Sequence, residues 1–493
     1  MAIKKEDFVI LDGCYHRYPN TTGVRYQLKL LEDKFVFQAK GKLTEVRLED
    51  VIGCHVMRFS SDRSDDGTSK DSAFFSLYAY HLATRKGIKG GLARQRHTYI
   101  FEVDICATYE NNLKVARKWQ SAVLWLLRGH RFLINGSGDE PLIPESLPAQ
   151  RRYLCLVNPK SGPGKSLEIF LERVRPVLSE ADVSHLLLVT ERINHARDFV
   201  RNLELDQWCG IVIISGDGLL HEVYNGLMER SDAEEAIKIP IGMIPGGSGN
   251  GLARSICHAS GEPYLVDPIL ACTLACVKGR LQELDLFRIE MPSKPPIYSF
   301  LSFGWGIMSD IDIESEKLRS IGEIRFTLWA FWRIFNLRTY SGRISYMPAK
   351  EKRIMSSPVD ANANVTADDT FPTLEQKVPD DWLVEEGRFV IIYSSLVSHL
   401  GTKLFFAPEA RLDDGVTWLM MIKGEASRRQ ILSYFINQEV GKHVDLPWVK
   451  IIPVRAFRLE SFDDSIITID GEIAHTDVVQ GRVLPGKARI LSF

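Results

Sequence analysis

One carboxylate stands inside a glycine-rich turn, at Asp217 in the segment SGDG, residues 215–218. The apolar run 211–214 predicts a buried strand, and residues 219–227 show helical spacing, so a helix is expected to begin just after the second glycine. A strand, a glycine-rich turn and a helix in this order form a ready phosphate site. A negative charge would weaken a site for phosphate alone, but phosphate transfer to a hydroxyl needs a group that accepts the hydroxyl proton. Asp217 is therefore a candidate general base, and the alternative is that it only caps the helix.

Two further glycine-rich segments follow predicted strands. The segment NPKSGPGKS at 158–166 follows the strand-like residues 153–157, and PGGSGNG at 245–251 follows the apolar run 239–244. The first segment ends in Gly-Lys-Ser and almost completes a Walker A pattern. Pro159 stands where the first glycine of that pattern belongs, so an ordinary P-loop fold is not expected.

Strands and helices alternate between residues 149 and 290. Residues 185–189 supply another strand, and helical spacing leads to Leu178 and, after a possible cap at Asn194, to Leu203. We therefore expect an α/β nucleotide-binding domain with a doubly wound parallel sheet at 149–290. Ligand loops in such sheets lie at the carboxyl ends of the strands, so the three glycine-rich segments should meet at one edge.

Residues 291–493 are dominated by strand patterns, and a second, mainly antiparallel β domain is expected there. The strand candidates are 298–303, 388–394, 416–422, 457–460 and 466–469, and the helix candidates are 324–337 and 426–437. Residues 350–380 are polar and include SSPVDANANVTADD, which predicts a disordered insertion.

Residues 1–148 predict a β-rich accessory domain. Its strand candidates are 24–30, 34–38, 43–48, 73–79 and 98–106. Thr108 can cap an amphipathic helix that carries Trp119, and several strands closed by one such helix resemble a pleckstrin-homology-like domain. The basic, glycine-rich loop 85–97 could hold an anionic lipid head group, although such loops are more often only solvated.

Composition narrows the class of protein. The 493 residues are 45% hydrophobic and 25% charged, with a formal net charge of -2, which is typical of a globular protein and argues against a basic nucleic-acid binder. The eight cysteines are scattered without a Cys-x-x-Cys pair, which suits a reducing compartment and predicts no zinc site. The sequence shows no signal peptide at its N-terminus and no run of about 18 apolar residues, so a cytoplasmic protein is expected.

The three glycine-rich segments together resemble the nucleotide-binding signatures of the diacylglycerol-kinase-like lipid kinases. SGDGL in place of GGDGT is most similar to the sphingosine kinases. The resemblance covers nearly all of residues 151–493 and continues through DIDIESEKLRSIGEIRFTL at 310–328, SHLGTKLFFAPEARLDDG at 398–415, VRAFRLE at 454–460 and IDGEIAHTDVVQG at 469–481. It implies an ATP- and Mg²⁺-dependent kinase that phosphorylates the primary hydroxyl of a sphingoid base to give sphingosine 1-phosphate.

The same resemblance implies residue roles. Asp217 would be the general base on the lipid hydroxyl. Asp312 and Ser302 would bind the substrate, with Asp312 contacting the protonated amine. The Mg²⁺ ligands are not assigned, since Asp217, Asp470 and Glu472 are all possible. The nucleotide would be bound by Asn158, Thr190, Ser215, Gly216, Gly218, Gly247, Ser248, Asn250, Arg319, Arg325, Asp470, Gly471 and Glu472.

Each of the less obvious assignments has a structural alternative. Arg319 and Arg325 would otherwise lie on an exposed helix edge. Residues 470–472 would otherwise be only a hairpin turn, because Asp-Gly is a turn signal. Asp312 would otherwise cap the following helix, a role equally open to Asp310.

Residues 325–338 combine apolar and aromatic side chains with arginines. A basic amphipathic helix of this kind is typical of a segment that meets a membrane surface or a calmodulin-like protein, and a core helix is the equal alternative. The sequence thus predicts a cytoplasmic enzyme that associates peripherally with membranes and binds no nucleic acid. The alternatives are a related kinase acting on ceramide or diacylglycerol, or an inactive lipid-binding scaffold, against which the intact Asp217 argues.

Overall fold

The computed structural model describes residues 8–19, 23–58, 71–85, 91–132, 141–321, 324–349 and 371–493. The chain forms two compact units, Met1–Arg152 with Glu172–His185, and Tyr153–Leu171 with Leu186–Phe493. Residues 86–90 of the predicted basic loop and residues 350–370 of the predicted insertion lie outside the described residues.

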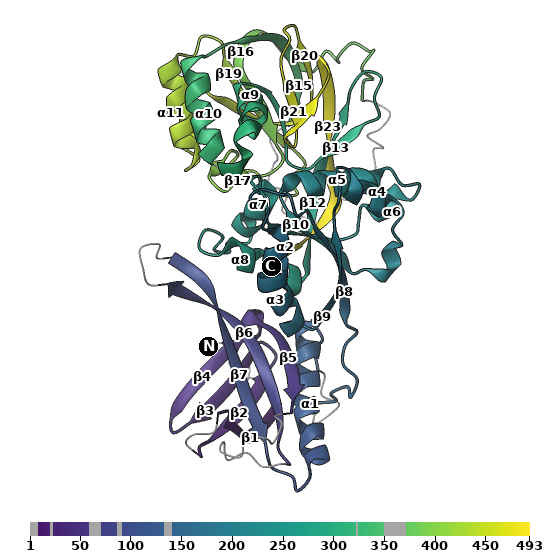
Figure 1. The fold of residues 1–493 in the computed structure, drawn as a ribbon, viewed down its shortest axis with the longest axis vertical. Coiled ribbons are helices and arrows are strands. Elements are labelled where there is room, and N and C mark those ends of the chain that lie inside the picture. The colour runs from purple at the N-terminus through teal and green to yellow at the C-terminus, as the bar shows by residue number, and fades with distance from the viewer. Residues whose placement is uncertain are drawn as a thin grey trace, which may run out of the picture. The chain divides into compact units, whose positions relative to one another are not determined.

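The first unit contains a seven-stranded antiparallel sheet and a long helix (Figure 1). The strand order is β4-β3-β2-β1-β7-β6-β5. The bounds are β1 Val9–Arg17, β2 Arg25–Leu31, β3 Lys34–Ala39, β4 Lys42–Arg47, β5 Val51–Met57, β6 Ala73–Arg85 and β7 Gly91–Val103. The predicted β-rich N-terminal region is confirmed as an antiparallel sheet, although the residue pattern did not predict β1 and β5.

Helix α1, Tyr109–Leu127, packs an apolar face on this sheet. The Trp119 indole stacks on the Phe75 ring with centroids 5.5 Å apart, and its N–H donates to the Tyr15 hydroxyl at 3.1 Å. Thr108 is the N-cap residue, as predicted, but its side chain makes no capping hydrogen bond. Burial of the apolar face therefore stabilises α1 more than its cap does.

Helix α3, Arg175–Glu180, also belongs to the first unit. The Glu180 carboxylate accepts hydrogen bonds from the Tyr80 hydroxyl and the Arg96 guanidinium, both at 2.7 Å. A Cβ on Gly53 would lie 1.9 Å from the Glu180 carbonyl oxygen, so this approach of α3 to β5 requires glycine.

A parallel sheet carries the glycine-rich segments. Strand β10, Gly210–Ser215, lies between β8, Arg151–Val157, and β11, Ile241–Pro245, and is parallel to both. Strand β9, Val183–Val189, follows β8 in the strand order. Every residue of β10 is buried, which explains its continuous apolar run. The helices around the sheet are α2 Ser166–Ile169, α4 His195–Arg201, α5 Asp217–Met228, α6 Ala233–Ala236, α7 Gly251–Ala259 and α8 Pro268–Lys278.

The remaining strands are mainly antiparallel, as predicted. They are β12 Arg280–Glu290, β13 Ile297–Ser299, β14 Ser302–Gly306, β15 Tyr340–Pro348, β16 Leu383–Ser395, β17 His399–Gly401, β18 Leu404–Phe405, β19 Thr417–Lys423, β20 Lys450–Ser461, β21 Ile467–Ile469, β22 Glu472–Ala474 and β23 Val478–Ser492. The helices are α9 Ile307–Glu314, α10 Ile324–Phe335 and α11 Arg428–Gln438. Strand β23 is parallel to β11 and antiparallel to β12 and β20, so one 14-stranded sheet runs through both halves of this unit. The domain boundary near residue 290 stays a prediction.

The structure revises two details of this region. The predicted strand 298–303 is divided into β13 and β14, because the Leu301 N–H bonds to the Asp470 carboxylate instead of a strand neighbour. Residues 371–379 are held in place by hydrogen bonds to their carbonyl groups. Arg458 donates to the Thr373 carbonyl and Gln480 donates to the Pro372 carbonyl, so this end of the predicted insertion is tied to β20 and β23.

Candidate functional site

The three glycine-rich segments meet at one edge of the parallel sheet. The Gly216 N–H donates to the Ser161 hydroxyl at 3.0 Å, and the Asp217 N–H donates to the Gly249 carbonyl at 3.0 Å. A Cβ on Gly247 would lie 2.4 Å from the Gly216 Cα, so the second and third loops touch through their backbones. The predicted convergence of the loops is confirmed, and the glycines permit it because they lack a Cβ.

Three residues assigned to the nucleotide make hydrogen bonds at this edge of the sheet. The side-chain carbonyl oxygen of Asn158 accepts from the Lys160 N–H at 2.9 Å, and the Asn250 amide donates to the Gly247 carbonyl at 2.8 Å. Thr190 follows β9, and its N–H donates to the Val157 carbonyl at 2.8 Å, which places it at the same edge of the sheet. Of the two serines assigned to the nucleotide, Ser215 is buried and Ser248 is half-buried. Their roles toward a nucleotide stay predictions.

Asp217 is the first residue of α5, so the helix begins earlier than predicted. Its side chain does not cap α5. One oxygen, Oδ2, accepts from the Gly251 N–H at 2.7 Å and so caps the neighbouring helix α7. Burial raises the pKa of Asp217 to about 7, against the hydrogen bonds from Gly251 and Leu252. The other oxygen, Oδ1, is buried without a hydrogen-bond partner among the described residues, so its capacity to accept a hydrogen bond is unused.

The turn at residues 470–472 lies across from the start of α5. A Cβ on Gly218 would lie 3.5 Å from a carboxylate oxygen of Glu472, whose side chain is exposed. Asp470 is 5% exposed and has a φ of 50°, and the turn joins β21 to β22. Residues 470–472 do form the hairpin turn of the structural alternative, and this hairpin also brings a carboxylate to the glycine-rich loops.

The Asp470 carboxylate is engaged by the chain itself. Its Oδ1 accepts from the Ser299 hydroxyl at 2.6 Å and from two backbone N–H groups, those of Leu301 and Ser302, at 3.0 Å each. Its Oδ2 lies 2.8 Å from the Nδ1 of His221. Glu472, with its exposed side chain, is therefore the better candidate of the two for a nucleotide or Mg²⁺. The sequence pattern did not single out His221, although its place four residues after Asp217 was a usable signal.

Asp312 faces the same turn from helix α9. A Cβ on Gly471 would lie 3.3 Å from Oδ2 of Asp312, and Oδ1 is 4.0 Å from the Arg325 guanidinium. Its side chain keeps 31% of its surface exposed, yet the surrounding protein is dense enough that desolvation raises the pKa of Asp312 to about 7. The Arg325 charge opposes that rise, and Glu316 and Glu472 add to it. The Ser302 hydroxyl, the other predicted substrate contact, lies 3.1 Å from the Tyr393 hydroxyl.

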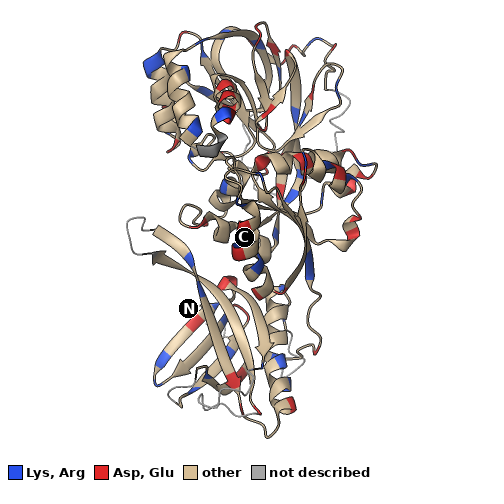
Figure 2. Ribbon diagram, viewed as in Figure 1, with Lys and Arg blue, Asp and Glu red and all other residues tan. Residues whose placement is uncertain are grey.

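Both acidic alternatives for capping are wrong, because Asp310 and Asp312 lie inside α9, where acidic residues gather (red in Figure 2). Asp310 has a structural role of its own. It accepts a hydrogen bond from the Tyr340 hydroxyl and lies 3.3 Å from the Arg333 guanidinium and 3.5 Å from that of Arg338. Asp312 has no such set of partners among the described residues and can therefore face a ligand.

The structure describes the side chain of only one of the two arginines assigned to phosphate. Arg325 is only 4% exposed, so the exposed-edge alternative is wrong for this residue. Arg319 lies on a 3-10 helix, Ser315–Ile321, but its side chain is outside the described part of the structure. Contact of either guanidinium with phosphate stays a prediction.

Helix α10 carries an exposed apolar surface. Phe331 and Trp332 are each 58% exposed and Phe335 is 74% exposed, whereas Ala330 and Ile334 are buried. The core-helix alternative is therefore wrong for the exposed face. Two side chains of α10 bind Glu314 of α9. The Arg333 guanidinium forms an ion pair with the Glu314 carboxylate, and the Trp329 indole N–H donates a hydrogen bond to it.

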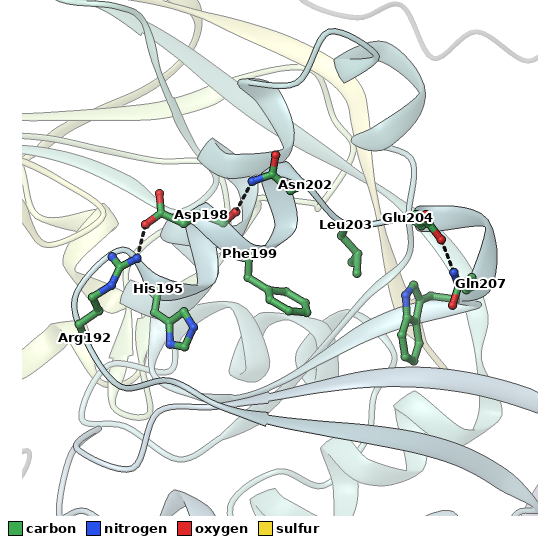
Figure 3. Close-up of a pocket in the computed structure, with 9 residues that line it drawn as sticks. Arg192, His195, Asp198, Phe199, Asn202, Leu203, Glu204 and Gln207 are labelled. Atoms are coloured by element: carbon green, nitrogen blue, oxygen red, sulfur yellow. Dashed lines mark hydrogen bonds and ion pairs between the residues drawn. The ribbon is translucent and has the colours of Figure 1, made fainter.

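A separate surface hollow of about 560 Å³ lies beside α4 (Figure 3). Arg192 and Asp198 form an ion pair of 2.7 Å at its edge, and Phe199 and Leu203 add apolar surface. None of the residues that the sequence assigned to nucleotide, substrate or catalysis lines it. The hollow therefore does not belong to the site around Asp217.

Among the described residues, no helix is long and apolar enough to cross a membrane, and no group of three or more His, Cys, Asp or Glu side chains is arranged to hold a metal ion. Magnesium commonly takes only one or two protein carboxylates and completes its shell with nucleotide phosphates and water. The exposed carboxylate of Glu472 fits that requirement, and the buried Oδ1 of Asp217, which has no hydrogen-bond partner among the described residues, is a second candidate oxygen.

Comparison with known proteins agrees with this geometry. Residues 152–289 match the family model of the diacylglycerol kinase catalytic domain, and residues 355–492 match that of the YegS C-terminal NAD kinase beta sandwich-like domain. Sphingosine kinase 1 of Rattus norvegicus and that of Homo sapiens are each 42% identical to the chain, over 69% of this chain and 90% of the relative. Sphingosine kinase 2 of Homo sapiens is 32% identical over 98% of this chain and 91% of that protein. The chain therefore belongs to the sphingosine kinase family and is a lipid kinase with a diacylglycerol kinase catalytic domain.

Proposed function

We propose that this kinase transfers the γ-phosphoryl group of ATP to the primary hydroxyl of a sphingoid base and forms sphingosine 1-phosphate. The observation that carries the proposal is a pair of carboxylates, Asp217 and Asp312, on the two sides of the 470–472 turn. Each has its pKa raised to about 7 by desolvation. One carboxylate suits the reacting hydroxyl and the other suits the neighbouring ammonium group.

Asp217 serves as the general base. A base with a pKa near 7 combines a useful ionised fraction with enough basicity to accept the hydroxyl proton. Its Oδ1, which has no other hydrogen-bond partner among the described residues, receives that proton, while Oδ2 stays bound to the Gly251 N–H. The proton transfer makes the lipid oxygen a better nucleophile toward the γ-phosphorus, and the bond from that phosphorus to the β,γ-bridging oxygen breaks.

The three loops and two charged groups hold the nucleotide. Backbone N–H groups in the loops and the N-terminus of α5 stabilise phosphate charge, and Arg325 contributes a guanidinium. Glu472 and Asp217 would hold Mg²⁺ together with the nucleotide, and a bound Mg²⁺ would supply charge neutralisation for the transferred group. These residues orient the γ-phosphate toward the hydroxyl that Asp217 deprotonates.

Asp312 binds the protonated amine of the substrate. A charge-assisted hydrogen bond to a carboxylate contributes about 1.5–3 kcal/mol, which is enough to separate an ammonium group from the neutral amide of ceramide or the ester of diacylglycerol. Desolvation raises the pKa of Asp312 even though the Arg325 guanidinium lies 4.0 Å away, so a protonated amine would be a second cation that favours the ionised carboxylate. Ser302, beside Tyr393, completes the polar end of the lipid site.

The rest of the chain supports access to the substrate. Three domains at 1–148, 149–290 and 291–493 form a pleckstrin-homology-like module, a doubly wound nucleotide domain and a lipid domain. The exposed apolar side chains of α10 rest on a membrane surface from which the lipid is drawn, and the same basic helix suits a calmodulin-like protein. The enzyme is cytoplasmic and peripherally membrane-associated.

A lipid panel tests the substrate class. Purified enzyme is assayed with sphingosine, ceramide and diacylglycerol, and sphingosine is expected to be the preferred substrate. Asp312→Ala should raise KM for sphingosine about ten-fold or more and leave KM for ATP nearly unchanged. Asp310→Ala, two residues away on the same helix, is the matched control and should lower the melting temperature instead. Equal turnover of ceramide or diacylglycerol by the wild type would contradict the amine-reading role, and no turnover of any lipid would indicate a scaffold.

A further inference from the structure

His221 is a polar residue of the site with no role in the reaction described so far. It lies on α5, four residues after Asp217, and its Nδ1 is 2.8 Å from the buried Oδ2 of Asp470. We propose that His221 is a positioning residue: through Asp470 it holds the 470–472 turn against α5, so that Glu472 stays beside Asp217. The proposal rests on the kinase reaction proposed above but does not depend on which lipid is phosphorylated.

The bonds of Asp470 are unevenly shared. The Ser299 hydroxyl and the Leu301 and Ser302 N–H groups bind its Oδ1, and its own N–H donates to the Ser302 carbonyl at 2.8 Å. The Phe300 N–H donates to its Oδ2 at 3.4 Å. These partners all lie in the β13–β14 region, on the lipid-binding side of the turn. Within the described part of α5, His221 is the residue that bonds to Asp470, so it alone connects this carboxylate to the helix of the general base.

The turn contacts both halves of the site. A Cβ added to Gly218 would lie 3.5 Å from a carboxylate oxygen of Glu472, and one added to Gly471 would lie 3.3 Å from a carboxylate oxygen of Asp312. Residues four apart on a helix share one face, so His221 supports the turn from the same face that presents Asp217. A shift of the turn away from α5 would therefore move Glu472 relative to Asp217 while Asp312, which α9 carries, keeps its place.

His221→Ala should consequently lower kcat and leave substrate binding less affected. A misplacement of about 1 Å in a phosphotransfer site can cost on the order of 100-fold in rate. We expect kcat to fall by about ten-fold or more, with KM for the lipid changed by less than about three-fold. His221→Asn should recover most of the lost kcat, because the asparagine amide N–H can occupy nearly the place of the imidazole Nδ1–H.

Asn225 offers a matched control on the same helix. Its amide donates to the Tyr298 carbonyl at 3.0 Å and its carbonyl oxygen accepts from the Tyr298 N–H at 2.9 Å, so it ties α5 to β13 without touching Asp470. Asn225→Ala should lower the melting temperature but keep kcat within about three-fold of wild type. All variants are assayed as full chains on whichever lipid the wild type phosphorylates best, and the folded fraction is checked by circular dichroism.

Two results would overturn the positioning role. One is a kcat for His221→Ala equal to that of Asn225→Ala, which would mean that general loosening of α5 explains the effect. The other is a folded His221→Asn protein that is no more active than His221→Ala. If His221→Ala does not fold, the corresponding result is a folded His221→Asn protein whose kcat is about ten-fold below that of the wild type. Failure of the substrate proposal is seen separately, in the wild-type lipid panel, and leaves the ratios between variants unchanged.

Discussion

Replacement of Asp217 by asparagine should inactivate the kinase and stabilise the fold at the same time. The pKa of the folded-state carboxyl is raised from 3.8 to about 7, and the group is 5% exposed. Between those two pH values the folded protein holds a proton that the unfolded chain releases, so stability falls as pH rises through this window. A rise of about 3 in pKa corresponds to about 4 kcal/mol, which the wild type has lost in full above pH 7.

Asparagine removes the free-energy cost of burying a charged carboxylate, because it carries no charge. Its amide oxygen can still accept a hydrogen bond from the Gly251 N–H. We expect Asp217→Asn to melt several degrees above the wild type at about pH 8.5 without nucleotide, and the difference to shrink steadily as the pH is lowered toward about 4. Activity should fall by about 10²–10⁴. Thermal melts over this pH range and a radiometric lipid-phosphorylation assay measure the two effects.

Asp285→Asn is the matched control. Burial raises the pKa of Asp285 to about 6, and its oxygens accept from the Gly415 and Gly486 N–H groups, away from the three glycine-rich loops. It should keep full activity. Its gain in stability at alkaline pH should be smaller than the pKa shift alone implies, because asparagine offers one oxygen to these two N–H donors. A melting temperature of Asp217→Asn at or below that of wild type at about pH 8.5 would refute the desolvation argument. Retention of more than a tenth of wild-type activity would refute the base assignment.

Two further experiments test the loops and the exposed helix. Gly247→Ala should raise KM for ATP about ten-fold or more, because the new Cβ would lie 2.4 Å from the Gly216 Cα and push two loops apart. Steady-state kinetics measure this effect, and an unchanged KM would show that the loops do not bind nucleotide. The double variant Phe331→Glu with Trp332→Glu should reduce liposome co-sedimentation without lowering the melting temperature, since both side chains are 58% exposed. The control Ile334→Glu should lower the melting temperature, because Ile334 is only 8% exposed. A large loss of stability in the double variant would mean that both residues are needed in the core.

The local pattern of residues was sufficient to predict the core of the candidate site. A fully buried parallel strand must be apolar throughout, and a close turn after it must be glycine, so β10 and the loop at Asp217 are both visible in the sequence. The convergence of three such loops follows from the rule that parallel strands present their carboxyl ends at one edge. Strand patterns were also sufficient for the antiparallel character of the C-terminal half, but not for β23, which pairs with strands far away along the chain.

Long-range packing decided what each carboxylate can do. Asp310 and Asp312 are two residues apart on one helix, yet one is buried among Tyr340 and two arginines and the other faces the 470–472 turn, because side chains at i and i+2 point in different directions. Asp470 bonds to groups about 170 residues away and to His221 across 249 residues, partners that no local spacing reveals. The sequence by itself therefore determined which residues have the chemistry for phosphoryl transfer. The tertiary structure decided which of them are free to use it, since burial and the pairing of distant segments set both the pKa and the remaining hydrogen-bonding capacity of each group.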